Sequence, residues 1–206
     1  MEKILNTYIE TLKEAGAGSA KVIKKVDHAE RVATLNTFDK VTVPQQLEIL
    51  LSYEYDDDLC YEFDYNDPEF AWSMYLLSFD EIQTTYENLA GLNGDDCTYF
   101  PLGFVPILGD FGGSFVVVNC IKNSPTYGAV YNIGDGVGAN MLATDLAHFF
   151  KASTEELTQK LRFFEEPELS DAIDARLWFE GVAKIFGNTP YFSRKGNMDQ
   201  QIIDWI

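Results

Sequence analysis

The spacing of apolar residues predicts three helices at the N-terminal end of the chain. Leu5, Tyr8 and Leu12 recur three and four positions apart, so they share one face of an amphipathic helix. The next two helices show the same periodicity, and a proline close to the start of the third suits the first turn of a helix. The predicted helices cover residues 2–15, residues 22–33 and a segment that begins at Thr42 and Pro44.

Short apolar segments between residues 99 and 133 predict the sheet. Residues 114–121 contain three consecutive valines, and residues 128–133 form a second apolar run bounded by turn residues. Prolines interrupt the preceding segment, residues 99–108, and are expected to divide it into short strands. Residues 134–138, which contain three glycines, are predicted to be a loop.

A tight turn is predicted between two of these strands, where glycines surround one aspartate. A glycine can take a positive φ or let another backbone approach closely, and an aspartate can accept hydrogen bonds from nearby backbone N–H groups. The predicted turn residues are Gly109, Asp110, Gly112 and Gly113. Part of this turn spells the Asp-Phe-Gly triplet of protein kinases, but the chain has no HRD catalytic loop and is too short for a kinase core.

Helices are also predicted on the C-terminal side of the sheet and immediately before it. Ser78 and Glu81 have the spacing of a capping box, in which the serine hydroxyl and the glutamate carboxylate bond reciprocal backbone N–H groups. The predicted helices are residues 79–90 with an end at Gly91, a short helix capped by Thr144, a helix from a second capping box at Ser153 and Glu156 to about Phe164, and residues 170–186. This layout predicts an α+β fold, in which a compact, mainly antiparallel sheet packs with helices and carries N- and C-terminal helical extensions.

The composition fits one folded domain. The chain has 206 residues, of which 46% are apolar and 23% are charged, values typical of a globular protein with a sizeable core. Its three cysteines, Cys60, Cys97 and Cys120, are widely spaced and include no CxxC pair, which disfavours disulfides and a structural zinc site. The N-terminus lacks the pattern of a signal peptide, and no apolar run is long enough to span a membrane. We therefore expect a cytoplasmic protein.

The charge is strongly negative and unevenly distributed. Fifteen Lys and Arg residues against 33 Asp and Glu residues give a net charge of −18. Residues 41–110 contain fifteen acidic side chains and no Lys or Arg, so this stretch holds nearly all of the excess. Such a charge disfavours nucleic acid and anionic membranes as partners, and it favours a cationic partner.

Within that stretch, residues 53–75 form an acidic–aromatic segment, in which eight aromatic residues are interleaved with eight acidic ones. In residues 61–65 the alternation has a period of two, which in an extended chain places rings on one side and carboxylates on the other. Two interpretations are open: a solvated face whose rings belong to the core, or an interface with a cationic protein. The candidate partner-binding residues are Asp56, Asp57, Asp58, Tyr61, Glu62, Phe63, Asp64, Tyr65, Asp67, Glu69 and Trp72.

The sequence contains no motif that supports catalysis or metal binding. Its two histidines, His28 and His148, are not accompanied by a nucleophile motif, although residues distant in sequence can still meet in space. The aspartates between residues 56 and 67 do not fit a twelve-residue calcium loop with its glycine and closing glutamate. We therefore predict that the protein is not an enzyme and uses no metal or cofactor.

An ordered series of short patterns between Pro44 and Lys151 resembles the SUKH superfamily of Knr/Smi-like domains. The patterns are the proline and apolar repeat of residues 43–51, the strand and S-x-x-E-I helix of residues 74–82, the glycine–aspartate hairpin of residues 100–113, the closing strand of residues 128–131 and the helix of residues 142–150. The chain departs from the family at residues 53–58, where an Asn-Gly pair is often found. The resemblance implies an α+β fold. It also implies a function as an immunity protein that neutralises a toxin, or as a regulatory or scaffold protein. It implies no catalytic residues in this chain.

The resemblance and the charge together predict a domain organisation and a function. Residues 1–40 are expected to be an N-terminal helical extension, residues 41–152 the Knr/Smi-like domain, and residues 153–206 C-terminal helices packed on that domain. The predicted function is that of a cytoplasmic immunity protein that binds and neutralises a cognate toxin with a basic surface, such as a nuclease. The alternative is a cytosolic regulatory or scaffold protein without a toxin partner.

Overall fold

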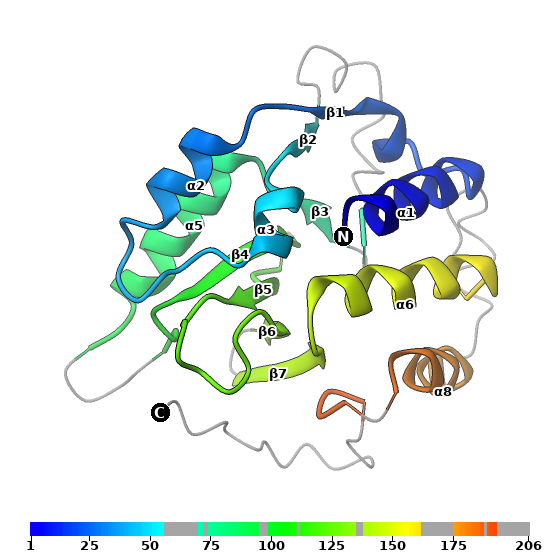
Figure 1. Cartoon of the computed structure of the whole chain (residues 1–206). Helices are drawn as coiled ribbons and strands as arrows, with labels where there is room; N and C mark the ends of the chain where they lie inside the picture. Colours follow the sequence, from blue (N-terminus) through cyan, green and yellow to red (C-terminus); the bar gives the residue numbers. More distant parts are fainter. Residues whose placement is uncertain are drawn as a thin grey trace.

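A computed structural model of the chain confirms the α+β fold (Figure 1). A five-stranded antiparallel sheet occupies the middle of the chain, and helices precede and follow it. The residues that the structure describes are 1–55, 70, 71, 74–94, 99–110, 112–134, 138–161, 175–187 and 189–192. Among these residues, no helix combines the length and the apolar character that a membrane span requires.

The sheet is a meander in which each strand pairs with the next one along the chain. Its order is β3-β4-β5-β6-β7, and every pair is antiparallel. Every residue of β4 is buried and three consecutive valines of β5 have no exposed surface, so both faces of the sheet are covered at its centre. The strands are β3 (Tyr75–Leu76), β4 (Phe104–Gly109), β5 (Phe115–Asn119), β6 (Val130–Gly134) and β7 (Gly138–Ala143).

Two details of the sheet differ from the sequence prediction. β4 passes through Pro106 as one strand, and the register between β4 and β5 shifts between Pro106 and Leu108. This irregularity accommodates a residue that has no N–H group to donate to the neighbouring strand. β7 was not predicted at all: β6 extends to Gly134 and β7 begins at Gly138, the two ends of the predicted glycine loop.

Three helices pack in a row beside the sheet. α1 (Glu2–Glu14) lies against α6 (Leu146–Thr158), and α6 lies against α8 (Ala175–Phe186) (Figure 1). α1 buries the apolar face that its periodicity predicts. One hydrophobic cluster of buried side chains extends from Leu5 to Phe192, so these helices and the sheet share a single core.

Two further helices support the N-terminal and central parts of the chain. α3 (Gln45–Leu50) follows Pro44, which occupies its N-cap position. α5 (Phe79–Gly91) packs against β4 and ends at the predicted glycine. The predicted capping box at its start is confirmed, because the Ser78 side chain accepts from the Glu81 N–H and the Glu81 side chain accepts from the Ser78 N–H.

The predicted second helix, residues 22–33, is wrong as far as residue 28, whereas residues 29–33 are helical. This part of the chain forms a 3₁₀ helix (Ser19–Val22), strand β1 (Ile23–Lys25) and helix α2 (Ala29–Leu35). β1 pairs with β2 (Tyr53–Tyr55) in a separate two-stranded antiparallel sheet. Hydrogen bonding to a distant strand therefore outweighs the local helical periodicity, since intrinsic propensity is weak compared with tertiary contacts.

The predicted helix boundary at Ser153 is also wrong. α6 is one continuous helix that contains Ser153, and the Ser153 side chain is fully buried inside it. The N-cap is Asp145 rather than Thr144: the Asp145 Oδ1 atom accepts a hydrogen bond of 2.7 Å from the His148 N–H. The helix predicted over residues 170–186 agrees with α8 where the structure describes it, and Gly187 follows with a φ of 73°.

Candidate partner-binding surface

The predicted partner-binding residues lie outside the described part of the chain, whereas the residues on both sides of them are described. The former are Asp56, Asp57, Asp58, Tyr61, Glu62, Phe63, Asp64, Tyr65, Asp67, Glu69 and Trp72. The described parts of the acidic–aromatic segment are β2, residues 70 and 71, and residues 74 and 75. The contacts of these flanks and of α5 show how the described ends of the acidic–aromatic segment are attached to the rest of the fold.

The first flank is held by β1 and β3. In the β1–β2 pair, Lys24 lies opposite Glu54 and Lys25 lies opposite Tyr53. The Tyr55 hydroxyl accepts a hydrogen bond of 3.1 Å from the N–H of Leu76 in β3. β2 is therefore attached both to the N-terminal part of the chain and to the end strand of the main sheet.

The second flank is anchored in the hydrophobic core. The Phe70 side chain is fully buried, and its ring lies 5.4 Å from that of Tyr8 in α1 and 5.9 Å from that of Phe150 in α6. The Tyr8 hydroxyl donates a hydrogen bond to the Phe70 carbonyl, and the Phe70 N–H donates to the Met74 carbonyl at 2.8 Å. Both the backbone and the ring of Phe70 are thus fixed where the segment returns to the sheet.

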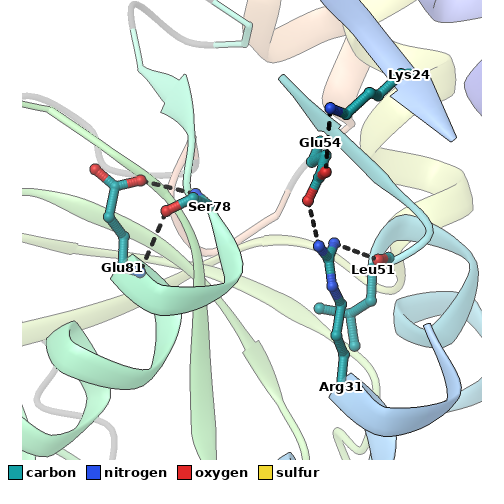
Figure 2. A network of polar contacts seen from close by, with 6 residues as sticks. All are labelled: Lys24, Arg31, Leu51, Glu54, Ser78 and Glu81. Carbon is teal, nitrogen blue, oxygen red and sulfur yellow. Dashed lines mark hydrogen bonds and ion pairs between the residues drawn. The ribbon is translucent and has the colours of Figure 1, made fainter. Parts of the chain in front are cut away.

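A polar network connects the start of the acidic–aromatic segment to α2 (Figure 2). The Arg31 guanidinium bonds the Glu54 carboxylate and also donates to the Leu51 carbonyl at 3.1 Å. Lys24 Nζ lies 3.7 Å from the other carboxylate oxygen of Glu54. The Arg31 and Glu54 side chains are only 18% and 22% exposed, so Glu54 is largely removed from solvent and serves the fold rather than a partner.

A second ion pair acts in the same region, between Lys25 of β1 and Glu2 of α1. The hydrogen bond from Lys25 lowers the pKa of the Glu2 carboxyl, and the same bond raises the pKa of Lys25. Lys25 also lies 5.4 Å from the centre of the Tyr53 ring. The two lysines of β1 therefore neutralise one acid of the acidic stretch, Glu54, and one acid of α1, Glu2.

Helix α5 presents acidic side chains to solvent. Asp80, Glu81 and Glu87 are exposed, and the helix contains no Lys or Arg. At its C-terminal end, Leu92 and Tyr99 are the large apolar residues that the described part of the chain leaves most exposed, at 58% and 41%. Acidic and apolar groups thus occur together on the exposed surface of α5 and of the residues that follow it.

Most of the described acids of residues 41–110 have no basic partner in the described part of the chain. Six of the fifteen acids are described, and of these Glu54 has basic partners there. The other five described acids form no ion pair with any described residue. They are Glu48, Asp80, Glu81, Glu87 and Asp110.

The glycine–aspartate turn between β4 and β5 uses its carboxylate locally. Asp110 Oδ1 accepts hydrogen bonds of 2.8 Å from the N–H groups of both Gly112 and Ser114. Gly113 has a φ of 85°, and a Cβ atom on Gly109 would lie 3.2 Å from the Leu77 side chain. The turn residues thus stabilise the backbone conformation of this hairpin.

In the described part of the chain, no cluster of three or more His, Cys, Asp or Glu residues could hold a metal ion. His28 precedes α2, whereas His148 lies in α6 beside Thr144. The Cys120 thiol is buried, and burial raises its pKa, which keeps the sulfur protonated and unreactive. Cys60 and Cys97 lie outside the described residues.

The network around Glu54 is the part of the site that sequence reasoning missed. In the sequence, Glu54 is one of the acids of the acidic–aromatic segment, and its contact with Lys24 depends on the β1–β2 pairing, which was not predicted. No protein-family model matches the chain, and a comparison with curated proteins finds no significant match. Its function is therefore argued from its residues.

Proposed function

We propose that the protein is a non-enzymatic protein-binding module of the SUKH (Knr/Smi-like) type, and that it serves as a cytoplasmic immunity protein against a cationic toxin. The observation that carries this proposal is that residues 41–110 hold fifteen acids and no Lys or Arg, and that five of the six described acids form no ion pair with a described residue. Like charges in a folded protein repel one another, and a cationic partner relieves that repulsion. A nuclease with a basic active-site surface is the toxin class that best suits this charge.

The acidic–aromatic segment is the proposed contact region. Its carboxylates would attract the partner, and its aromatic rings would supply the buried anchors that dominate binding energy at interfaces. The fixed flanks at Tyr55 and Phe70 favour this role, because they hold the ends of the segment independently of any partner. The exposed acids of α5, Asp80 and Glu87 among them, extend the negative field beside it.

The decisive genetic test is rescue of growth. If a gene for a large toxin lies next to this one, co-expression of the protein is expected to restore growth of cells that make the toxin. A failure to rescue, together with co-purification of housekeeping proteins, would favour the alternative of a regulatory or scaffold protein of the Knr/Smi type.

The charge assignment is tested separately by association kinetics with that toxin. The double variant Asp57→Lys/Asp64→Lys is expected to lower the association rate by about tenfold or more at low salt, and to flatten its salt dependence. The matched control, Glu14→Lys/Glu30→Lys, changes the net charge equally at exposed positions outside the acidic stretch and is expected to have a much smaller effect. Equal association rates for the two variants would refute steering by the acidic–aromatic segment.

A further inference from the structure

A groove of about 480 Å³ lies between α6 and α8. Its volume falls in the range of pockets that bind small molecules, about 300–1,000 Å³. α6 contributes His148, Lys151 and Glu155 to its lining, and α8 contributes Gly181 and Lys184. Neither helix belongs to the proposed toxin-binding surface, so the groove is a separate site.

The shape of the groove depends on small residues from both helices. Ala152 and Gly181 line it and leave space between the longer side chains. A Cβ atom on Gly181 would lie 2.9 Å from the Leu161 Cδ1 atom, so a larger residue at this position would require the Leu161 side chain to move.

The charge of the groove is opposite to that of the molecule. Lys151 and Lys184 both line it, and neither forms an ion pair with a described residue, although the chain has 33 acidic residues. Among the described residues of the lining, the carboxylate is that of Glu155, which already accepts a hydrogen bond of 2.7 Å from Gln159 Nε2. Two lysines thus line the same groove, and neither is paired with a described carboxylate.

His148 adds a hydrogen-bond donor to the same lining. Its Nδ1 atom lies 3.4 Å from the Thr144 backbone nitrogen, which can only donate, and 3.3 Å from the Thr144 hydroxyl oxygen. Nδ1 is therefore the acceptor in the contact with the Thr144 N–H, and Nε2 is the ring nitrogen left to donate to a ligand. His148 lines the groove together with the two lysines.

We propose that the groove between α6 and α8 binds a small phosphorylated molecule, with its phosphate held by Lys151 and Lys184 and assisted by His148. A phosphate monoester carries a charge of about −1.5 to −2 at pH 7, which two ammonium groups can balance, whereas a single carboxylate carries half of that. Lysine binds phosphate as a point charge without demanding a fixed geometry. The remainder of the ligand would contact Ala152 and the apolar side chain of Ile185.

The test is a titration of the full chain with glucose 6-phosphate, followed by the backbone amide signals in NMR spectra. Saturable shifts are expected at residues 148–155 and 181–185, and glucose at the same concentrations is expected to cause none. Glucuronate, which carries one carboxylate at C6 of the same pyranose ring, is expected to bind about tenfold more weakly. Equal affinities for glucuronate and glucose 6-phosphate would overturn the assignment to phosphate.

Two matched variants complete the test. Lys151→Gln/Lys184→Gln is expected to weaken glucose 6-phosphate binding by about tenfold or more. Lys21→Gln/Lys122→Gln changes the net charge equally at exposed lysines outside the groove, and its affinity is expected to stay within about twofold of the parent. The site would be refuted if Lys151→Gln/Lys184→Gln left the affinity for glucose 6-phosphate unchanged, or if both variants lost the same affinity. Amide chemical-shift changes centred outside the groove would also refute it.

Discussion

At the scale of single residues, Arg31 and Glu54 form the best-supported polar contact near the acidic–aromatic segment. Replacing Arg31 by Met leaves the largely buried Glu54 carboxylate without its guanidinium partner and the Leu51 carbonyl without its donor. We expect Arg31→Met to lower the free energy of unfolding by about 2 kcal/mol. Lys13→Met, which breaks the exposed pair with Glu10, is expected to change it by less than about 0.5 kcal/mol. If urea denaturation showed the same loss of unfolding free energy for both variants, the structural role of Arg31 would be contradicted.

A second residue-scale prediction concerns the Cys120 thiol. Burial raises its pKa in the folded state. Its stabilising contribution is therefore fully present below the unfolded-state pKa of about 8.5 and is lost as the pH rises through the higher folded-state value. In a Cys60→Ser/Cys97→Ser variant, a thiol reagent at about pH 8 is expected to modify Cys120 only after urea is added. Rapid modification without urea would show that the thiol is accessible.

At the scale of elements, two Ser-x-x-Glu motifs with the same spacing have different roles. Ser78 caps α5, whereas Ser153 lies inside α6, where its hydroxyl has no hydrogen-bond partner among the described residues. Ser78→Ala and Asp145→Ala are each expected to lower the free energy of unfolding by about 1 kcal/mol. Ser153→Ala removes a buried, unpartnered hydroxyl and is expected to leave stability unchanged or raise it. A loss of about 1 kcal/mol for Ser153→Ala, measured by urea unfolding, would contradict this assignment.

The same elements show how far the sequence predicts the fold. α1, α5 and β5 follow their own hydrophobic periodicity and caps, so local patterns suffice to predict them. β1 has three residues, and it forms because Ile23 pairs with Tyr55, far along the chain. That pairing depends on the tertiary arrangement, and a local pattern cannot contain it. β7 was missed for another reason: it pairs with the preceding strand β6, and the glycines between the two strands predict a loop.

The same reasoning applies to the candidate site. The excess of acids in residues 41–110 can be counted from the sequence. Which of these acids form ion pairs with basic residues cannot be predicted from it. Glu54 counts as one more acid in the run until the β1–β2 register brings Lys24 opposite it and Arg31 beside it. The phosphate groove was missed because Lys151 and Lys184 lie on helices whose packing the sequence does not specify.

At the scale of the whole molecule, the net charge of −18 predicts a salt-dependent stability. Raising NaCl from about 10 mM to about 150 mM shortens the Debye length to about 8 Å and screens repulsion among the acids. We expect the free energy of unfolding to rise, as measured by urea denaturation. The variant Glu48→Gln/Glu87→Gln is expected to reduce this salt effect, and Lys21→Gln/Lys122→Gln is expected to enlarge it. Stability that is independent of salt would contradict net self-repulsion.

The anchoring of Tyr55 and Phe70 affects how the sequence between them can vary in evolution. Both residues are tied to β3 or its immediate neighbours by bonds that do not involve the residues between them. An insertion, deletion or exchange between these two positions removes none of these bonds, so Tyr55 and Phe70 keep their attachments while the sequence between them varies.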